Sequence, residues 1–277
     1  MVFKNHFLAD RPQRNLMRDG DSRRASYAEQ LRLIFKLISM KVIGLIGGMS
    51  WESSAEYYKI LNEKMKAIQG GMASCKCLMY TVDFAQIHTL QHEEDWEQLN
   101  ALMADAAQRL YKGGAEVIIL CTNTMHLCSE AIKAAVPIPF IHIGEATGEA
   151  IKAQQLTKVG LLGTKFTMEK DFYKKVLADK YGIETIIPDA ADRDQIHQII
   201  YGELVLGKIE DASREVFKSI IKKLEDQGAE GVILGCTEIP LLIKSTDVDI
   251  PTFDTTTIHA EKAVEWALQE SLTTSVH

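Results

Sequence analysis

Two cysteines, Cys121 and Cys236, have surroundings in the sequence that could support chemistry. Each is followed by a threonine, and each comes at the end of an apolar run that predicts a buried strand. A Gly-Ala-Glu triplet precedes each run. The triplets lie at residues 114–116 and 228–230, and the apolar runs at residues 117–120 and 232–234. Because a thiolate is both a base and a nucleophile, this duplicated context favours catalysis over an ordinary buried cysteine.

Two thiols that face each other suit one reaction in particular, the inversion of a carbon centre. One thiolate removes a proton from one face of the carbon, and the other thiol returns a proton to the opposite face. Helices beginning just after the cysteines would place positive partial charge and free N–H groups beside each sulfur. Those N–H groups and the side chains that follow would also bind a carboxylate. The side chains are Thr122, Asn123, Thr124 and Thr237.

Strands and helices that alternate from residue 41 onward would position these groups. Residues 42–46 form a β-branched strand, and Ser50 caps a helix that runs to about residue 69. Further strands are expected at residues 77–82, 117–120, 138–143, 158–164, 184–188 and 232–234, with further helices at 95–112 and 212–227. This order requires crossover connections and predicts mainly parallel sheets that are covered on both faces.

The second half of the chain repeats the order of the first. Gly47 and Gly163 lie 116 residues apart, and Cys121 and Cys236 lie 115 residues apart. The fold class is therefore α/β, with two similar doubly wound lobes of mainly parallel four-stranded sheets related by an approximate two-fold axis. Ligands of such sheets bind beyond the carboxyl ends of the strands. The active site is expected in the cleft between the lobes, with one cysteine on each side.

Composition and charge exclude several classes of function. The 277 residues are 46% hydrophobic and carry a formal charge of −7, which argues against binding to nucleic acid. No apolar run approaches the roughly 18 residues that a membrane span requires. Five scattered cysteines without a visible signal peptide indicate reduced thiols in a cytoplasmic protein.

Residues 1–39 differ from the remainder of the chain. They contain eight Lys and Arg residues against four Asp and Glu residues, and much of the segment lacks periodicity. A transit peptide would be poor in acidic residues, which this segment is not. We expect an N-terminal extension that is disordered or loosely helical, with the domain proper beginning at Met40.

From Lys41 to about Leu268 the sequence resembles the cofactor-independent aspartate/glutamate racemases. The matching runs are residues 44–53 (GLIGGMSWES), 121–126 (CTNTMH), 163–165 (GTK), 235–238 (GCTE) and 253–255 (FDT). The resemblance implies an isomerase that interconverts L- and D-aspartate and/or glutamate without pyridoxal phosphate or a metal. It also implies that Cys121 and Cys236 are the two acid/base residues.

The resemblance further implies a set of substrate-binding residues and a division into lobes. The substrate-binding residues are Met49, Ser50, Gln91, Thr122, Asn123, Thr124, Thr164, Lys165, Thr237 and Glu238. In that family the closing segment packs back on the first lobe. We therefore expect a first lobe of residues 40–137 plus 249–277 and a second lobe of residues 138–248. The partner is a small acidic amino acid, and a homodimer is compatible with the sequence.

Other interpretations of the sequence stay open. Some racemases of this type bind the distal carboxylate with an arginine in a segment that corresponds here to residues 80–108, which contain no Lys or Arg. His88, Gln91 and His92 are available instead, so glutamate or a broader substrate range is equally allowed. Alternatives are another cysteine-dependent member of the superfamily (an isomerase, hydantoin racemase or decarboxylase) or a non-catalytic protein whose lobes clamp a small acid.

Overall fold

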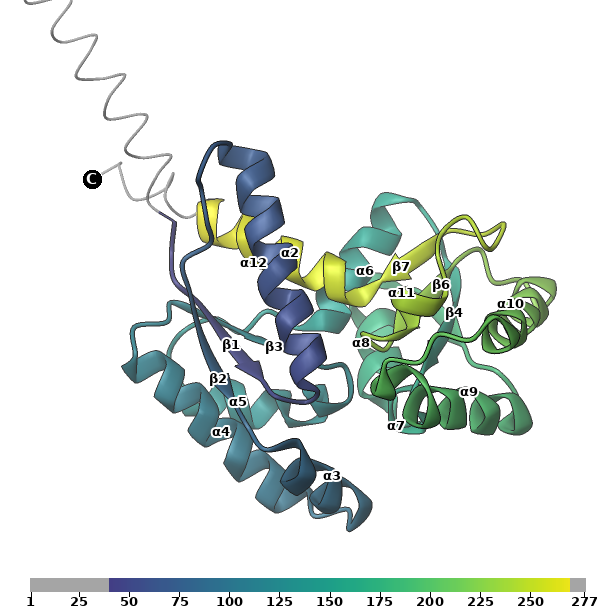
Figure 1. Cartoon of the computed structure of the whole chain (residues 1–277), viewed down its shortest axis with the longest axis horizontal. Helices are drawn as coiled ribbons and strands as arrows, with labels where there is room; N and C mark the ends of the chain where they lie inside the picture. The colour runs from purple at the N-terminus through teal and green to yellow at the C-terminus, as the bar shows by residue number, and fades with distance from the viewer. Residues whose placement is uncertain (1–39, 270–277) are drawn as a thin grey trace, which may run out of the picture.

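The computed structural model describes residues 40–269, which form two α/β lobes side by side (Figure 1). The expected extension at residues 1–39 lies outside the described residues. None of the helices described is both long enough and apolar enough to cross a membrane.

The first lobe is built on a parallel sheet with the strand order β2-β1-β3. The strands are β1 (Ile43–Gly47), β2 (Cys77–Thr81) and β3 (Val117–Leu120). Helix α2 (Trp51–Gln69) covers one face of this sheet. The other face is covered by α3 (Phe84–His92), α4 (Trp96–Lys112) and α5 (Ser129–Ala135). The strands expected at 42–46, 77–82 and 117–120 and the helices expected at 50–69 and 95–112 are confirmed to within a residue or two.

The second lobe repeats this plan with the strand order β5-β4-β6-β7. Its strands are β4 (Lys158–Gly163), β5 (Glu184–Ile186), β6 (Val232–Gly235) and β7 (Thr252–Asp254). One face packs against α9 (Ala190–Gly202), η2 (Leu204–Leu206), α10 (Asp211–Asp226) and α11 (Ile239–Leu242). The other packs mainly against α8 (Asp171–Tyr181), which follows the short α7 (Lys165–Glu169).

The expected strand at residues 138–143 is wrong, so the first sheet has three regular strands rather than four. Only Phe140 forms a parallel bridge, to Ile118. Pro137 and Pro139 lack the N–H groups that a regular ladder needs. In the second lobe, β7 occupies the corresponding edge as a true strand.

The two lobes exchange their last helices. Helix α6 (Ile143–Ala153) follows the first sheet, yet it packs in the core of the second lobe. Helix α12 (Thr255–Gln269) follows the second sheet, yet it crosses to cover the first sheet beside α2 (Figure 1). The expected division into lobes therefore needs two corrections. Strand β7 pairs in the second sheet, although residues 249–277 were expected in the first lobe. Phe140 borders the first sheet, although residues 138–248 were expected in the second lobe.

Two buried histidines fix the segment where the chain passes between the lobes. His126 Nδ1 donates to the Thr122 carbonyl at 2.8 Å, and its Nε2 accepts from the Ile143 amide at 3.1 Å. His259 Nε2 donates to the Ile141 carbonyl, and its Nδ1 accepts from the hydroxyl of Tyr57, both at 2.8 Å. Each ring must be neutral to make both of its contacts.

His142 lies between these contacts and caps α6. Its Nδ1 accepts from the Gly144 amide at 3.0 Å, which requires an unprotonated nitrogen. Burial lowers the pKa of His142 to about 4, and burial also lowers the pKa of His259 to about 4. The unfolded chain holds these histidines near their ordinary pKa of about 6.5. The folded protein therefore binds fewer protons between these values, and its stability falls as the pH drops from about 6.5 to 4.

We predict that His142→Asn reduces this acid sensitivity. Asparagine is a good helix cap that does not titrate, so stability at pH 7.5 should change by no more than about 1 kcal/mol. Full protonation of His142 would lower the free energy of unfolding by on the order of 3 kcal/mol. This contribution to the acid destabilisation should disappear in the variant. Urea unfolding of both proteins at pH 7.5 and 4.5 measures this double difference. An equal loss of stability in both proteins on acidification would contradict the prediction.

Candidate active site

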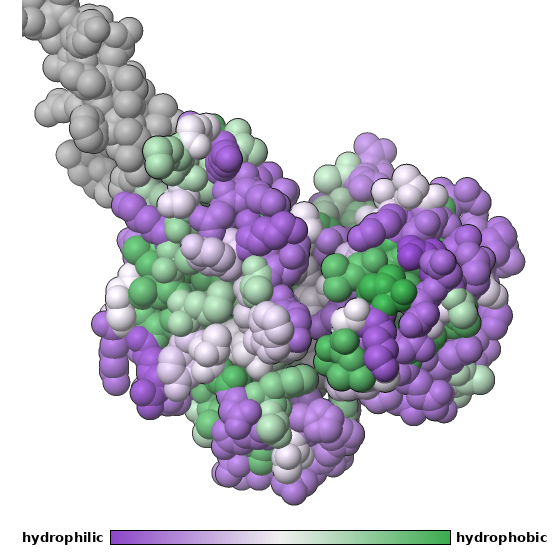
Figure 2. All heavy atoms as spheres, viewed as in Figure 1, coloured by the Kyte–Doolittle hydropathy of each residue, from purple (hydrophilic) through white to green (hydrophobic). Residues whose placement is uncertain are grey.

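A cavity lies between the lobes at the carboxyl ends of the strands, where the sequence places the site. It encloses about 510 Å³, including its opening to solvent. Figure 2 shows a groove between the lobes on one face, with apolar surface along the second-lobe side. The cavity is lined by Met49, Ser50, Phe84, Gln91, Thr122, Asn123, Thr124, Thr164, Ile200, Tyr201, Val205, Gly235, Cys236, Thr237 and Glu238.

Most of the residues expected at the site line this cavity. Cys236 does so, as does every expected substrate-binding residue except Lys165. Cys121 does not. The sequence interpretation missed the apolar part of the lining, which comprises Phe84, Ile200, Tyr201 and Val205. Helices α3 and α9, which supply the first three of these residues, were not predicted.

Cys121 points into the core of the first lobe. Side chains alternate along a strand, and Val117, Ile119 and Cys121 share the face that α2 and α12 cover. Cys121 is 0% exposed, whereas Cys236 is 9% exposed and reaches the cavity. The expectation that one thiol from each lobe faces the cavity is therefore not met in this structure.

The strand register makes Thr122 the counterpart of Cys236. Gly44 of β1 pairs with Ile118, and the equivalent Gly160 of β4 pairs with Val232. Four residues beyond these partners come Thr122 and Cys236. The sequence itself shows that the two cysteines are one residue out of register. Cys121 comes seven residues after the start of its Gly-Ala-Glu triplet, whereas Cys236 comes eight residues after the start of its own.

The carboxylate of Glu238 gathers the polar groups around Cys236. Its Oε2 accepts from the Cys236 thiol at 3.0 Å and from the Thr237 hydroxyl at 2.7 Å. Its Oε1 accepts from the hydroxyl of Ser50, in the first lobe, at 3.2 Å. These contacts hold the thiol against an acceptor for its proton and tie the two lobes together.

The positive partial charge expected beside each sulfur does not decide the pKa of either thiol. Burial raises the pKa of the Cys121 thiol, and burial followed by the charge of Glu238 raises that of Cys236. The helices after the cysteines are the five-residue 3₁₀ helix η1 (Thr124–Cys128) and the four-residue α11, so their dipoles are small. Both cysteines are therefore protonated thiols at neutral pH.

Asn123 offers an unused hydrogen-bond acceptor at the cavity. Its amide nitrogen donates to the Thr255 hydroxyl at 3.0 Å, and that hydroxyl donates to the Leu234 carbonyl at 2.9 Å. The Thr255 hydroxyl can therefore only accept from Asn123, which fixes the orientation of the amide. Asn123 Oδ1 is buried and has no protein partner, so it can accept from a ligand.

Hydroxyl groups close the cavity between the lobes. Thr124 of the first lobe lies 3.2 Å from Thr164 and 3.3 Å from Thr167 of the second lobe, oxygen to oxygen. On the first-lobe side, the Gln91 amide donates to Met125 Sδ at 3.0 Å. These neutral groups can donate hydrogen bonds to a carboxylate without adding charge.

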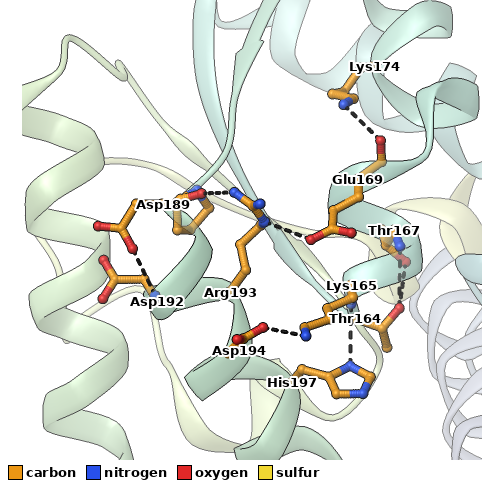
Figure 3. Close-up of polar contacts among 11 residues, drawn as sticks. Thr164, Lys165, Thr167, Glu169, Lys174, Asp189, Asp192, Arg193, Asp194 and His197 are labelled. Carbon is orange, nitrogen blue, oxygen red and sulfur yellow. Dashed lines mark hydrogen bonds and ion pairs between the residues drawn. The ribbon is translucent and has the colours of Figure 1, made fainter.

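Lys165, expected to bind a substrate carboxylate, lies outside the cavity wall. Its ammonium pairs with Asp194, and its backbone amide donates to His197 Nδ1 at 3.4 Å (Figure 3). The side chain is partly exposed, and Asp194 already compensates its charge. Within residues 40–269 no group of three or more His, Cys, Asp or Glu side chains is arranged to hold a metal ion.

Comparison with known proteins identifies relatives along most of the chain. The family described as Asp/Glu/hydantoin racemase matches residues 46–263. A protein from Yersinia pestis described as a candidate Asp/Glu racemase is 50% identical, with a TM-score of 0.79 over 83% of this chain and 100% of its own. An aspartate racemase homologue from Pyrococcus horikoshii is 36% identical, with a TM-score of 0.72 over 82% and 99%. The broad specificity amino-acid racemase RacX of Bacillus subtilis is 24% identical over 80% of this chain and 96% of its own length.

We predict that Glu238→Gln lowers the pKa of the Cys236 thiol by at least about one unit, because it removes the neighbouring negative charge. The rate at which iodoacetamide alkylates Cys236, followed by peptide mass spectrometry across a pH series, reports this pKa. The sealed Cys121 serves as the internal control and should stay unlabelled in the folded protein. A midpoint that does not move in the variant would show that burial alone sets the pKa.

Proposed function

The chain belongs to the Asp/Glu/hydantoin racemase family, and we propose that it is an amino-acid racemase that works without pyridoxal phosphate. One observation carries the proposal: Cys236 presents a thiol, hydrogen-bonded to a carboxylate, in a cavity between two lobes. No lysine is among the residues that line this cavity. None of them would therefore form the Schiff base on which pyridoxal chemistry depends.

The relatives support an amino acid as the substrate. One is named a broad specificity amino-acid racemase, and a second is described as an aspartate racemase homologue. Aspartate and glutamate, the substrates expected from the sequence, fall within that range. The cavity holds separate groups for the two charged ends that every amino acid shares.

The polar groups of the cavity fit the α-carboxylate and the α-ammonium. The hydroxyls of Thr124 and Thr164 would donate to the carboxylate and stabilise the negative charge that develops when the α-proton leaves. The ammonium would lie between Glu238 and Asn123 Oδ1, which are acceptors. Its positive charge would offset that of Glu238, which helps Cys236 to ionise.

Proton transfer begins at the contact between Cys236 and Glu238. The thiol proton moves to Glu238 Oε2, 3.0 Å away, and the thiolate then takes the α-proton of the substrate. The electron pair of the broken C–H bond is delocalised into the α-carboxylate. A bound substrate would displace water from the cavity, which strengthens the hydrogen bonds there.

The opposite face of the carbon would meet Thr122, whose hydroxyl would donate its proton to the carbanion. The proton held by Glu238 would then return to the Thr122 oxygen through solvent once the product leaves. The Thr122 hydroxyl occupies the position in the first lobe that Cys236 occupies in the second. A hydroxyl is a much weaker acid than a thiol, so the two faces would exchange protons at different rates. The expected mechanism with two cysteines would instead require Cys121 to turn out of the core.

A second candidate function follows from the single thiol at the cavity. A decarboxylase of the same superfamily needs only one proton donor, and Cys236 alone would supply it. Incubation with a substituted malonate and measurement of released carbon dioxide tests this candidate.

We predict that Cys236→Ser lowers racemisation by at least about 10³-fold, since serine is a far weaker acid and base than cysteine. The assay follows chiral composition and deuterium at the α-carbon in heavy water, with no added cofactor. Ligand binding measured by calorimetry should persist. Racemisation at the wild-type rate would show that the protein's role does not involve this thiol.

Variants of the adjacent residues Thr122 and Cys121 test which of the two exchanges a proton with the substrate from the first lobe. We predict that Thr122→Ala loses racemisation by about 10²-fold or more but still exchanges the α-proton of one enantiomer through Cys236. Cys121→Ala should keep racemisation within about threefold and lose some stability, because a small core group is removed. The reverse pattern would establish the mechanism with two cysteines and show that Cys121 reaches the substrate.

A further inference from the structure

The cavity has a polar wall and an apolar wall. The groups assigned above to the α-carboxylate and α-ammonium occupy the polar wall. Other polar side chains of the lining belong to Ser50, Gln91, Thr122, Cys236 and Thr237. The apolar or aromatic lining side chains are those of Met49, Phe84, Ile200, Tyr201 and Val205. A substrate held by its α-groups would therefore have apolar surface available to its side chain.

The lining contains one charged residue, and that charge is negative. Glu238 already accepts three hydrogen bonds and lies where the α-ammonium would bind. No Lys, Arg or His side chain is among the residues that line the cavity. The distal carboxylate of aspartate or glutamate would therefore be buried without a counter-ion and would repel Glu238.

Three basic residues of the second lobe, none of which lines the cavity, are occupied by other partners. Lys165 pairs with Asp194, and the Arg193 guanidinium donates to Glu169 at 2.9 Å (Figure 3). Lys170 pairs with Glu94 across the lobes at 3.4 Å.

Three histidines on α3 and α9, the helices that supply Phe84 and Tyr201 to the lining, have partners too. On α3, His88 and His92 lie 3.0 Å apart, nitrogen to nitrogen, so one ring donates to the other. On α9, His197 Nδ1 accepts the amide of Lys165. The rings of His88 and His197 also pack against the ring of Tyr201, which lines the cavity. None of these contacts directs a positive charge into the cavity.

We infer that the side-chain subsite formed by Phe84, Ile200, Tyr201 and Val205 selects α-amino acids with uncharged side chains over aspartate and glutamate. This inference rests on the proposed racemase activity and names the substrate class of the same site. The gain from burying an apolar side chain against this wall is available to such substrates. For a dicarboxylate, the cost of desolvating the second charge opposes that gain.

A substrate panel tests the inference. The full-length protein is incubated in heavy water with L-alanine, L-leucine, L-methionine, L-aspartate and L-glutamate, and kcat/KM is obtained from α-deuterium incorporation and chiral composition. At least one uncharged substrate should exceed both acidic ones by tenfold or more. A value for aspartate or glutamate that equals or exceeds every uncharged substrate would overturn the inference and leave the racemase function standing. No exchange with any substrate would overturn both.

A matched pair of variants tests the electrostatic cause. Val205→Arg places a cation at the apolar wall, whereas Leu206→Arg places it on the adjacent residue, which is 64% exposed and does not line the cavity. Val205→Arg should raise the ratio of aspartate to leucine kcat/KM by tenfold or more, and Leu206→Arg should change it less than threefold. Equal changes in the two variants would show that the wall does not set specificity.

Discussion

The carboxylate of Glu238 joins the two lobes where they enclose the cavity. It accepts hydrogen bonds from Cys236 and Thr237 of its own loop and from Ser50 of the other lobe. These donors offset the cost of burying it, and they fix the thiol beside a proton acceptor. In the proposed function, the same charge would bind the ammonium group of the substrate and would make the cavity unfavourable for a second carboxylate. The position of the Cys236 thiol, its proton transfer and the proposed choice of substrate thus all depend on the charge of Glu238.

The alternation of side chains along a strand decides which residues reach the cavity. A shift of one residue moves a side chain to the other face of the sheet. Cys121 continues the row of Val117 and Ile119 into the core, and Thr122 takes the position beside the cavity. The strand register therefore decides whether the side chain of Cys121 or that of Thr122 is available for chemistry at this edge of the sheet.

The sequence was sufficient to predict the parallel sheets, the internal repeat and most of the cavity lining. Short connections were harder, because Pro137 and Pro139 interrupt a run that otherwise has strand composition. Helices α3 and α9 have weak apolar periodicity, so their contributions Phe84 and Tyr201 were missed. The position of Lys165 depends on its pairing with Asp194, which lies 29 residues away in the sequence and gives no local signal. Burial, which raises the pKa of both thiols, is likewise a property of the folded chain alone.

The exchange of α6 and α12 has a consequence for the history of the chain. Each repeat supplies one of the helices that cover the other repeat's sheet, so a single repeat would leave part of its own core exposed. An ancestral half-length protein of this design would have been stable only as a pair of identical chains that traded their last helices. Gene duplication and fusion would then have made that swapped dimer permanent and freed its two equivalent halves to diverge, one carrying a thiol and the other a hydroxyl.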